Sequence, residues 1–203
     1  MKKRLMIILD NGHGVETRGK RSPDGKLIEY QWAREFVYYL NLKLRELCYD
    51  TYILVPEESD VSLGNRALRA NSLIKNLNKD IYEPVLLSIH INAASSDGKY
   101  HDARGFTSWV YTKGSEKSRK LGYMFASEAE LNRLVGNRWI PTDKYHTANF
   151  KILKETNCPA VLLENMFMDN KEDEEFLLSE EGRNKLLDMY IDVIKTYESY
   201  INK

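Results

Sequence analysis

The chain has 203 residues, of which 42% are hydrophobic, and its 30 Lys and Arg residues balance its 30 Asp and Glu residues. A net charge of zero argues against a nucleic-acid-binding protein, because binding to phosphates requires a basic surface. The length is typical of one domain, so we expect a single domain over residues 1–203.

The N-terminus predicts a strand rather than a signal peptide. Residues 2–4 are basic and residues 5–9 are apolar. The apolar run ends at Asp10, short of the apolar core of a signal peptide, and no small-residue cleavage site follows. No apolar segment reaches transmembrane length. We therefore expect a cytoplasmic chain, made without a signal peptide and without stable membrane insertion.

Strand-like and helical patterns alternate along the rest of the chain. Strands are predicted over 5–10, 51–55, 85–91, 105–111 and 160–164, and helices over 28–48, 62–77, 115–131 and 182–197. Two irregular stretches, 14–26 and 135–149, are predicted as surface loops beside a binding site. The alternation predicts an α/β fold. We expect a single three-layer domain with a mostly parallel twisted sheet of about five to six strands and helices on both faces.

Three polar side chains follow or close the apolar runs of predicted strands. His13 lies between two glycines, His90 is near the end of its run, and Glu164 closes the last one. The carboxyl ends of parallel strands share one edge of a sheet, so these side chains can converge there. Simpler alternatives stay open. The histidines could be hydrogen-bonded loop or core residues, and Glu164 could pair with Arg66 or Arg69.

Glu29 begins the first long predicted helix and offers a further carboxylate. The helix macrodipole alone also favours an acidic residue at this position. Two imidazoles and a carboxylate are the ligands of a catalytic zinc site with one open position. His13, Glu29 and His90 could therefore form such a site, and Glu164 could be the spare carboxylate that such a site needs to move protons.

Further polar residues are candidates for supporting the ligands or contacting a substrate, namely Asp10, Asn92, Arg66 and His146. Asp10 could orient the His13 imidazole, or it could form an Asx turn. Asn92 is expected on the same side of its strand as His90. It could hold a ligand or a substrate carbonyl, or it could form a turn at the strand end. Trp109 is predicted as a core residue rather than as a platform for a sugar.

Five segments, in order, resemble the zinc-dependent N-acetylmuramoyl-L-alanine amidases of bacteria and phages. Residues 10–14 (DNGHG) resemble the family's first histidine motif, and residues 88–93 (SIHINA) resemble the second. Glu29 matches the carboxylate ligand. Residues 63–71 (LGNRALRAN) resemble the Arg-x-x-x-Ala-Asn helix, and residues 159–170 (PAVLLENMFMDN) resemble the segment that carries the catalytic glutamate.

The resemblance implies an endolysin-like enzyme with one zinc ion on His13, Glu29 and His90. Glu164 would act as general base and acid in hydrolysis of the amide between N-acetylmuramic acid and L-alanine. The implied substrate is peptidoglycan or a muropeptide. We expect a monomer that acts at the bacterial cell wall, with release through a phage holin as one route. Residues 1–203 would form the catalytic domain, with no separate cell-wall-binding domain.

Two alternative functions stay open. The chain could be a zinc peptidase that cuts another bond of the stem peptide, or a non-catalytic relative that binds the wall. The products of hydrolysis separate the first alternative from an amidase. The second predicts that Glu164→Ala has no effect on function.

Overall fold

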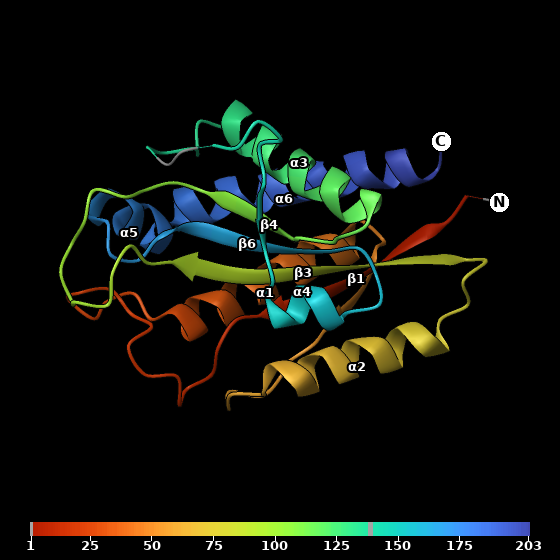
Figure 1. Cartoon of the computed structure of the whole chain (residues 1–203), viewed down its shortest axis with the longest axis horizontal. Helices are drawn as coiled ribbons and strands as arrows, with labels where there is room; N and C mark the ends of the chain where they lie inside the picture. Colours follow the sequence, from red (N-terminus) through yellow and green to blue (C-terminus); the bar gives the residue numbers. More distant parts are fainter. Residues whose placement is uncertain (1, 138–139) are drawn as a thin grey trace.

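The computed structural model describes residues 2–137 and 140–203, and its centre is a six-stranded sheet (Figure 1). The strand order is β2-β1-β3-β6-β4-β5, and every pair is parallel except β4 with β6. The predicted α/β fold with a mostly parallel sheet is therefore confirmed. The strands are β1 (Arg4–Asn11), β2 (Asp50–Ile53), β3 (Tyr82–Asn92), β4 (Thr107–Tyr111), β5 (His146–Ala148) and β6 (Ala160–Phe167).

Helices cover both faces of the sheet, which gives the predicted three layers (Figure 1). Residues of α1, α3 and α6 form one core cluster with one face, and residues of α2 and α4 form a second cluster with the other. The helix α5 packs against α6 and β6. The helices are α1 (Glu29–Glu46), α2 (Leu63–Asn76), α3 (Glu116–Leu131), α4 (Lys151–Glu155), α5 (Lys171–Leu178) and α6 (Glu180–Ile201).

The central strands are apolar on both sides because helices cover both sides. Ile7, Ile8 and Leu9 are completely buried, although consecutive residues of a strand point to opposite faces. In α1, Phe36 and Leu40 are buried at helical spacing, as the sequence predicts. Within the described part of the chain, none of the helices has the length and apolarity needed to cross a membrane.

The sequence prediction is wrong at several short elements. Residues 135–149, predicted as a loop, contain the edge strand β5, whereas residues 138–139 of that stretch lie outside the described residues. The helices α4 and α5 have five and eight residues, too few to show a helical period. The strand β6 continues past Glu164 to Phe167, so Glu164 lies inside the strand rather than at its end.

Candidate metal centre

His13, Glu29 and His90 come together at the carboxyl edge of the sheet, from the loop after β1, the start of α1 and the end of β3. One ligand atom from each lies within 4.8 Å of the other two. The Nδ1 atom of His90 is 3.1 Å from Oε1 of Glu29, and Nε2 of His13 is 3.4 Å from Oε2. The two imidazole rings are nearly perpendicular, at 87°, with centroids 5.0 Å apart. The three predicted ligands thus form a compact group.

The glycines beside His13 allow this close approach. His13 has a φ of 62°, in the left-handed region that few side chains adopt. A Cβ atom on Gly12 would overlap with the His90 ring, and one on Gly14 would overlap with the backbone of Asp60. The glycines therefore let the loop pass directly over the His90 imidazole.

We expect Gly12→Ala to weaken zinc binding about tenfold or more, because its Cβ displaces the His90 ring. Competition with a chromophoric chelator measures the affinity. Gly64→Ala in α2 is the matched control, since its Cβ meets only the end of the Lys151 side chain at 3.6 Å. Equal zinc affinity in the two variants would contradict the role given to Gly12.

Two arginines hold the His13 backbone in place. Nη2 of Arg34 and Nη2 of Arg66 donate hydrogen bonds to the His13 carbonyl oxygen, at 3.1 and 3.0 Å. Arg66 also donates to the Asn11 carbonyl at 2.6 Å. These bonds help to stabilise the left-handed conformation of His13. Nothing in the sequence pattern singles out Arg34, because its contact with the loop depends on tertiary structure.

Both carboxylate oxygens of Asp10 have partners other than the His13 imidazole, whose orientation is one of the two roles that the sequence leaves open for Asp10. Asp10 accepts hydrogen bonds from Nη1 of Arg66 at 2.8 Å and from the Ser88 hydroxyl at 2.6 Å. Asp10 is 1% exposed and Arg66 is 2% exposed, so neither faces a substrate. Asp10 instead supports His13 indirectly, by fixing the Arg66 guanidinium that binds the His13 carbonyl.

Glu29 is a buried carboxylate whose two oxygens face the two histidines. Its Oε1 accepts the Ile91 backbone N–H at 2.9 Å, whereas Oε2 has an ion-pair contact with Nε2 of His13 at 3.4 Å. Burial opposes ionisation, but the hydrogen bonds and charges of His13 and His90 outweigh it and lower the pKa of Glu29. The group offers one carboxylate and two imidazole ligand atoms within 4.8 Å of one another. This donor set fits a zinc ion with one open position.

Glu164 lies beside the ligand group on the neighbouring strand, in register with His90. Its Oε2 is buried and makes no hydrogen bond to any residue in the described ranges. Burial raises the pKa of Glu164 to about 7; the charge of Glu29 also raises it, and that of His90 opposes the rise. The alternative of an arginine partner is wrong, because Arg66 and Arg69 pair with other carboxylates.

The other two candidates, Asn92 and His146, lie outside the ligand group. Oδ1 of Asn92 accepts the Ala93 backbone N–H at 2.9 Å, which matches the strand-end alternative. His146 is paired in register with Trp109, and the two rings stack with centroids 4.6 Å apart. Neither belongs to the ligand group.

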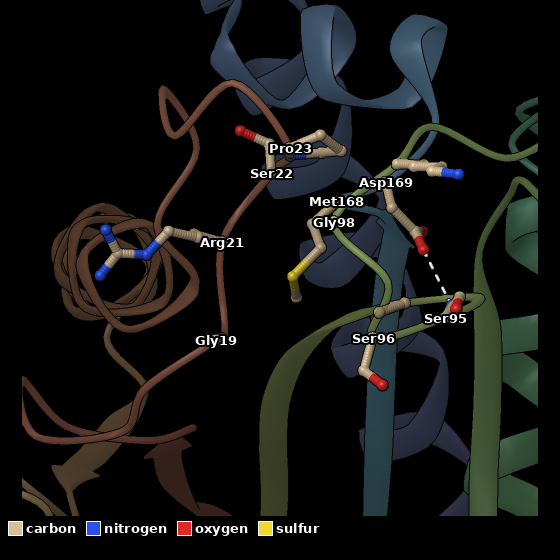
Figure 2. Close-up of a pocket in the computed structure, with 11 residues that line it drawn as sticks. Gly19, Arg21, Ser22, Pro23, Ser95, Ser96, Gly98, Met168 and Asp169 are labelled. Atoms are coloured by element: carbon tan, nitrogen blue, oxygen red, sulfur yellow. Dashed lines mark hydrogen bonds between the residues drawn. The ribbon is translucent and has the colours of Figure 1, made fainter.

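A groove of about 240 Å³ is lined in part by Ala93, which follows His90 by three residues in the chain (Figure 2). The stretch 14–26, predicted as a substrate rim, supplies one wall. Figure 2 shows the Met168 side chain extending toward that wall, whereas the Arg21 side chain points away from the groove. The lining residues are Gly19, Arg21, Ser22, Pro23, Ala93, Ser95, Ser96, Gly98, Lys99, Met168 and Asp169.

Two histidines after parallel strands and a glutamate at the start of α1 form a group at the edge of this α/β sheet that could hold a metal ion, as in a metal-dependent hydrolase. The family model for N-acetylmuramoyl-L-alanine amidases matches residues 7–196. The chain therefore belongs to the N-acetylmuramoyl-L-alanine amidase family.

Curated relatives are similar in sequence, and solved structures have the same fold. The chain is 26% identical to the endolysin of Bacillus phage SPP1 over 87% of its length, and 27% identical to the probable cell wall amidase LytH of Staphylococcus aureus over 95%. It spans 59% and 58% of those relatives. An N-acetylmuramoyl-L-alanine amidase from Clostridium difficile 630 has the same fold, with a TM-score of 0.76, 24% identity and 97% of each chain covered. Ami1 of Mycobacterium smegmatis gives 0.81 at 17% identity, covering 98% and 99%.

Proposed function

We propose that this chain is a zinc-dependent amidase that hydrolyses the bond between N-acetylmuramic acid and L-alanine in peptidoglycan. The observation that carries the proposal is the buried Glu29 carboxylate grouped with two imidazoles, with Glu164 beside them. Membership of the amidase family supports the choice of substrate.

The residues of the site have two separate roles in hydrolysis. His13, Glu29 and His90 would hold the zinc ion, which supplies Lewis acidity to activate water and polarise a carbonyl. Glu164 accepts the proton of the attacking water and then donates it to the amine of the leaving peptide. Its buried position suits both steps, because a carboxyl group that is neither strongly acidic nor paired can accept and release a proton.

The site of action that we propose is the bacterial cell wall. The relatives from Bacillus phage SPP1 and Staphylococcus aureus are named as an endolysin and a probable cell wall amidase. We further propose that residues 1–203 form the catalytic domain and act as a monomer. All four site residues come from one chain, so the site needs no partner subunit.

Product analysis tests the proposed function directly. A purified muropeptide is incubated with the zinc-loaded protein, and the fragments are identified by mass spectrometry. We expect an intact stem peptide with a free L-alanine amino group, together with a muramic acid whose lactyl carboxyl is free. Cleavage between two amino acids of the stem would instead show a peptidase, and no cleavage would favour a non-catalytic relative.

A further inference from the structure

The strand β6 contains one extra residue directly after Glu164. Glu164 lies opposite His90 of β3. Three residues later, Phe167 lies opposite Asn92, which is only two residues after His90. Within this stretch, Met166 has a φ of 66°, in the left-handed region that few side chains adopt. An extra residue of this kind forms a β-bulge, and bulges beside active sites turn a side chain in a new direction. The bulge therefore helps to decide where Glu164 lies.

The Asn165 side chain holds the two strands together at the bulge. Asn165 follows Glu164 directly, so it points to the opposite face of the sheet, where it is completely buried. Its Nδ2 donates hydrogen bonds to the carbonyl oxygens of His90 at 3.0 Å and Leu163 at 3.2 Å. The first bond crosses from β6 to β3. Asn165 therefore joins the backbone of a proposed metal ligand to the segment that carries Glu164.

Tyr190 of α6 fixes the other end of the Asn165 amide. Its hydroxyl donates to Oδ1 of Asn165 at 3.0 Å, and the whole side chain is buried. The Tyr190 ring makes edge contacts with Phe36 of α1 and Phe125 of α3, with centroids 5.1 and 5.0 Å away. These contacts hold the hydroxyl in place. Because the hydroxyl donates to the amide oxygen, the amide nitrogen is left to donate to the two carbonyls.

Glu164 depends on its backbone for its position. Its buried Oε2 has no hydrogen bond to the part of the chain that the structure describes, so no side-chain contact fixes that oxygen. A general base has to lie within hydrogen-bond reach of the water that it deprotonates. A misplacement of about 1 Å can lower the rate about 100-fold. Any group that sets the path of β6 beside His90 therefore influences proton transfer.

We propose that Asn165 and Tyr190 are positioning residues, which set the distance between Glu164 and the metal ligands. Both are buried on the face of the sheet opposite to Glu164, so they act through the backbone of β6 and β3 and touch no substrate. This role rests on the proposed function, because only a reaction that uses Glu164 as its base depends on that distance.

Tyr190→Phe tests the pair by removing a single hydroxyl. We expect kcat for a muramoyl peptide to fall about tenfold, with KM and zinc content unchanged. Tyr197→Phe is the matched control, about two turns further along the same helix. Tyr197 is also buried, and its hydroxyl has no hydrogen-bond partner among the described residues. This control should keep the kcat of the wild type. Steady-state kinetics and metal analysis of the same samples measure all three quantities.

Asn165→Leu combined with Tyr190→Phe removes both polar side chains of the pair, so neither is left buried without its partner. We expect this double variant to lower kcat about 30-fold, again with KM and zinc content unchanged. When the same two substitutions are made in Glu164→Gln, the residual rate should fall by less than about twofold. The base whose position they set is then absent, so the effects are not additive.

Wild-type kcat in Tyr190→Phe would overturn the proposal, and this variant decides alone if the double variant fails to fold. An equal loss in Tyr197→Phe, or an equal fractional loss in the Glu164→Gln background, would also overturn it by showing a general effect on the fold. Loss of zinc would show that the pair supports the ligands rather than Glu164. A zinc-loaded wild type without amidase activity would instead refute the proposed function itself.

Discussion

Glu164→Gln is expected to lower kcat for muramoyl amide hydrolysis about 1,000-fold while leaving zinc binding intact. Glutamine has the size of glutamate but cannot accept the proton of the attacking water. Glu164 is not one of the three grouped ligand residues, so its replacement leaves their atoms in place. Steady-state kinetics on a purified muropeptide, with metal analysis of the same sample, measures both quantities.

His90→Ala is the informative comparison for this variant, because it should lose zinc and activity together. The two variants therefore separate proton transfer from metal binding. Glu164→Gln with activity within tenfold of the wild type would contradict the role of Glu164. Loss of zinc from Glu164→Gln would show that this carboxylate belongs to the ligand set.

Arg66→Met is expected to lower the free energy of unfolding by about 3–5 kcal/mol, because it leaves a buried carboxylate without its partner. Arg66 and Asp10 are almost completely buried and lie 2.8 Å apart. Arg66 also binds the carbonyl oxygens of Asn11 and His13. The variant should therefore lose stability and also hold zinc more weakly. Urea unfolding measures the stability.

Arg69→Met provides the matched control, one turn further along the same helix. Arg69 pairs with Glu57, but the two side chains are 35% and 40% exposed. Such a surface pair contributes about 0–1 kcal/mol. Equal destabilisation by the two substitutions would contradict the special role of the buried Arg66 network.

The long elements of the fold could be predicted from the sequence because their periods reflect burial. The run through Ile7, Ile8 and Leu9 has to be apolar on both sides, and α1 repeats buried residues at helical spacing. The strand β5 could not be predicted in this way. Its three residues are ordered by pairing with β4, and that pairing is a tertiary contact.

The candidate ligands could be proposed from their positions in the sequence. The residues that hydrogen-bond to the ligand loop could not. His13 and His90 follow strands that are neighbours in the sheet, and the family resemblance identified Glu29. The contacts of Arg66 depend on side-chain directions across 53 to 56 residues of sequence. Nothing in a local pattern encodes such directions, so the sequence left the role of Asp10 open and did not reveal its contact with Arg66.

Zinc titration of the metal-free protein tests the central claim most directly. Hydrolysis of a muropeptide is followed as zinc is added, for the wild type and for His13→Ala. We expect wild-type activity to rise linearly and stop at one zinc per chain, with the L-alanine amino group released in parallel. His13→Ala should stay inactive at that ratio. Full activity of the metal-free wild type, or a plateau at two zinc ions per chain, would contradict a single metal held by His13, Glu29 and His90.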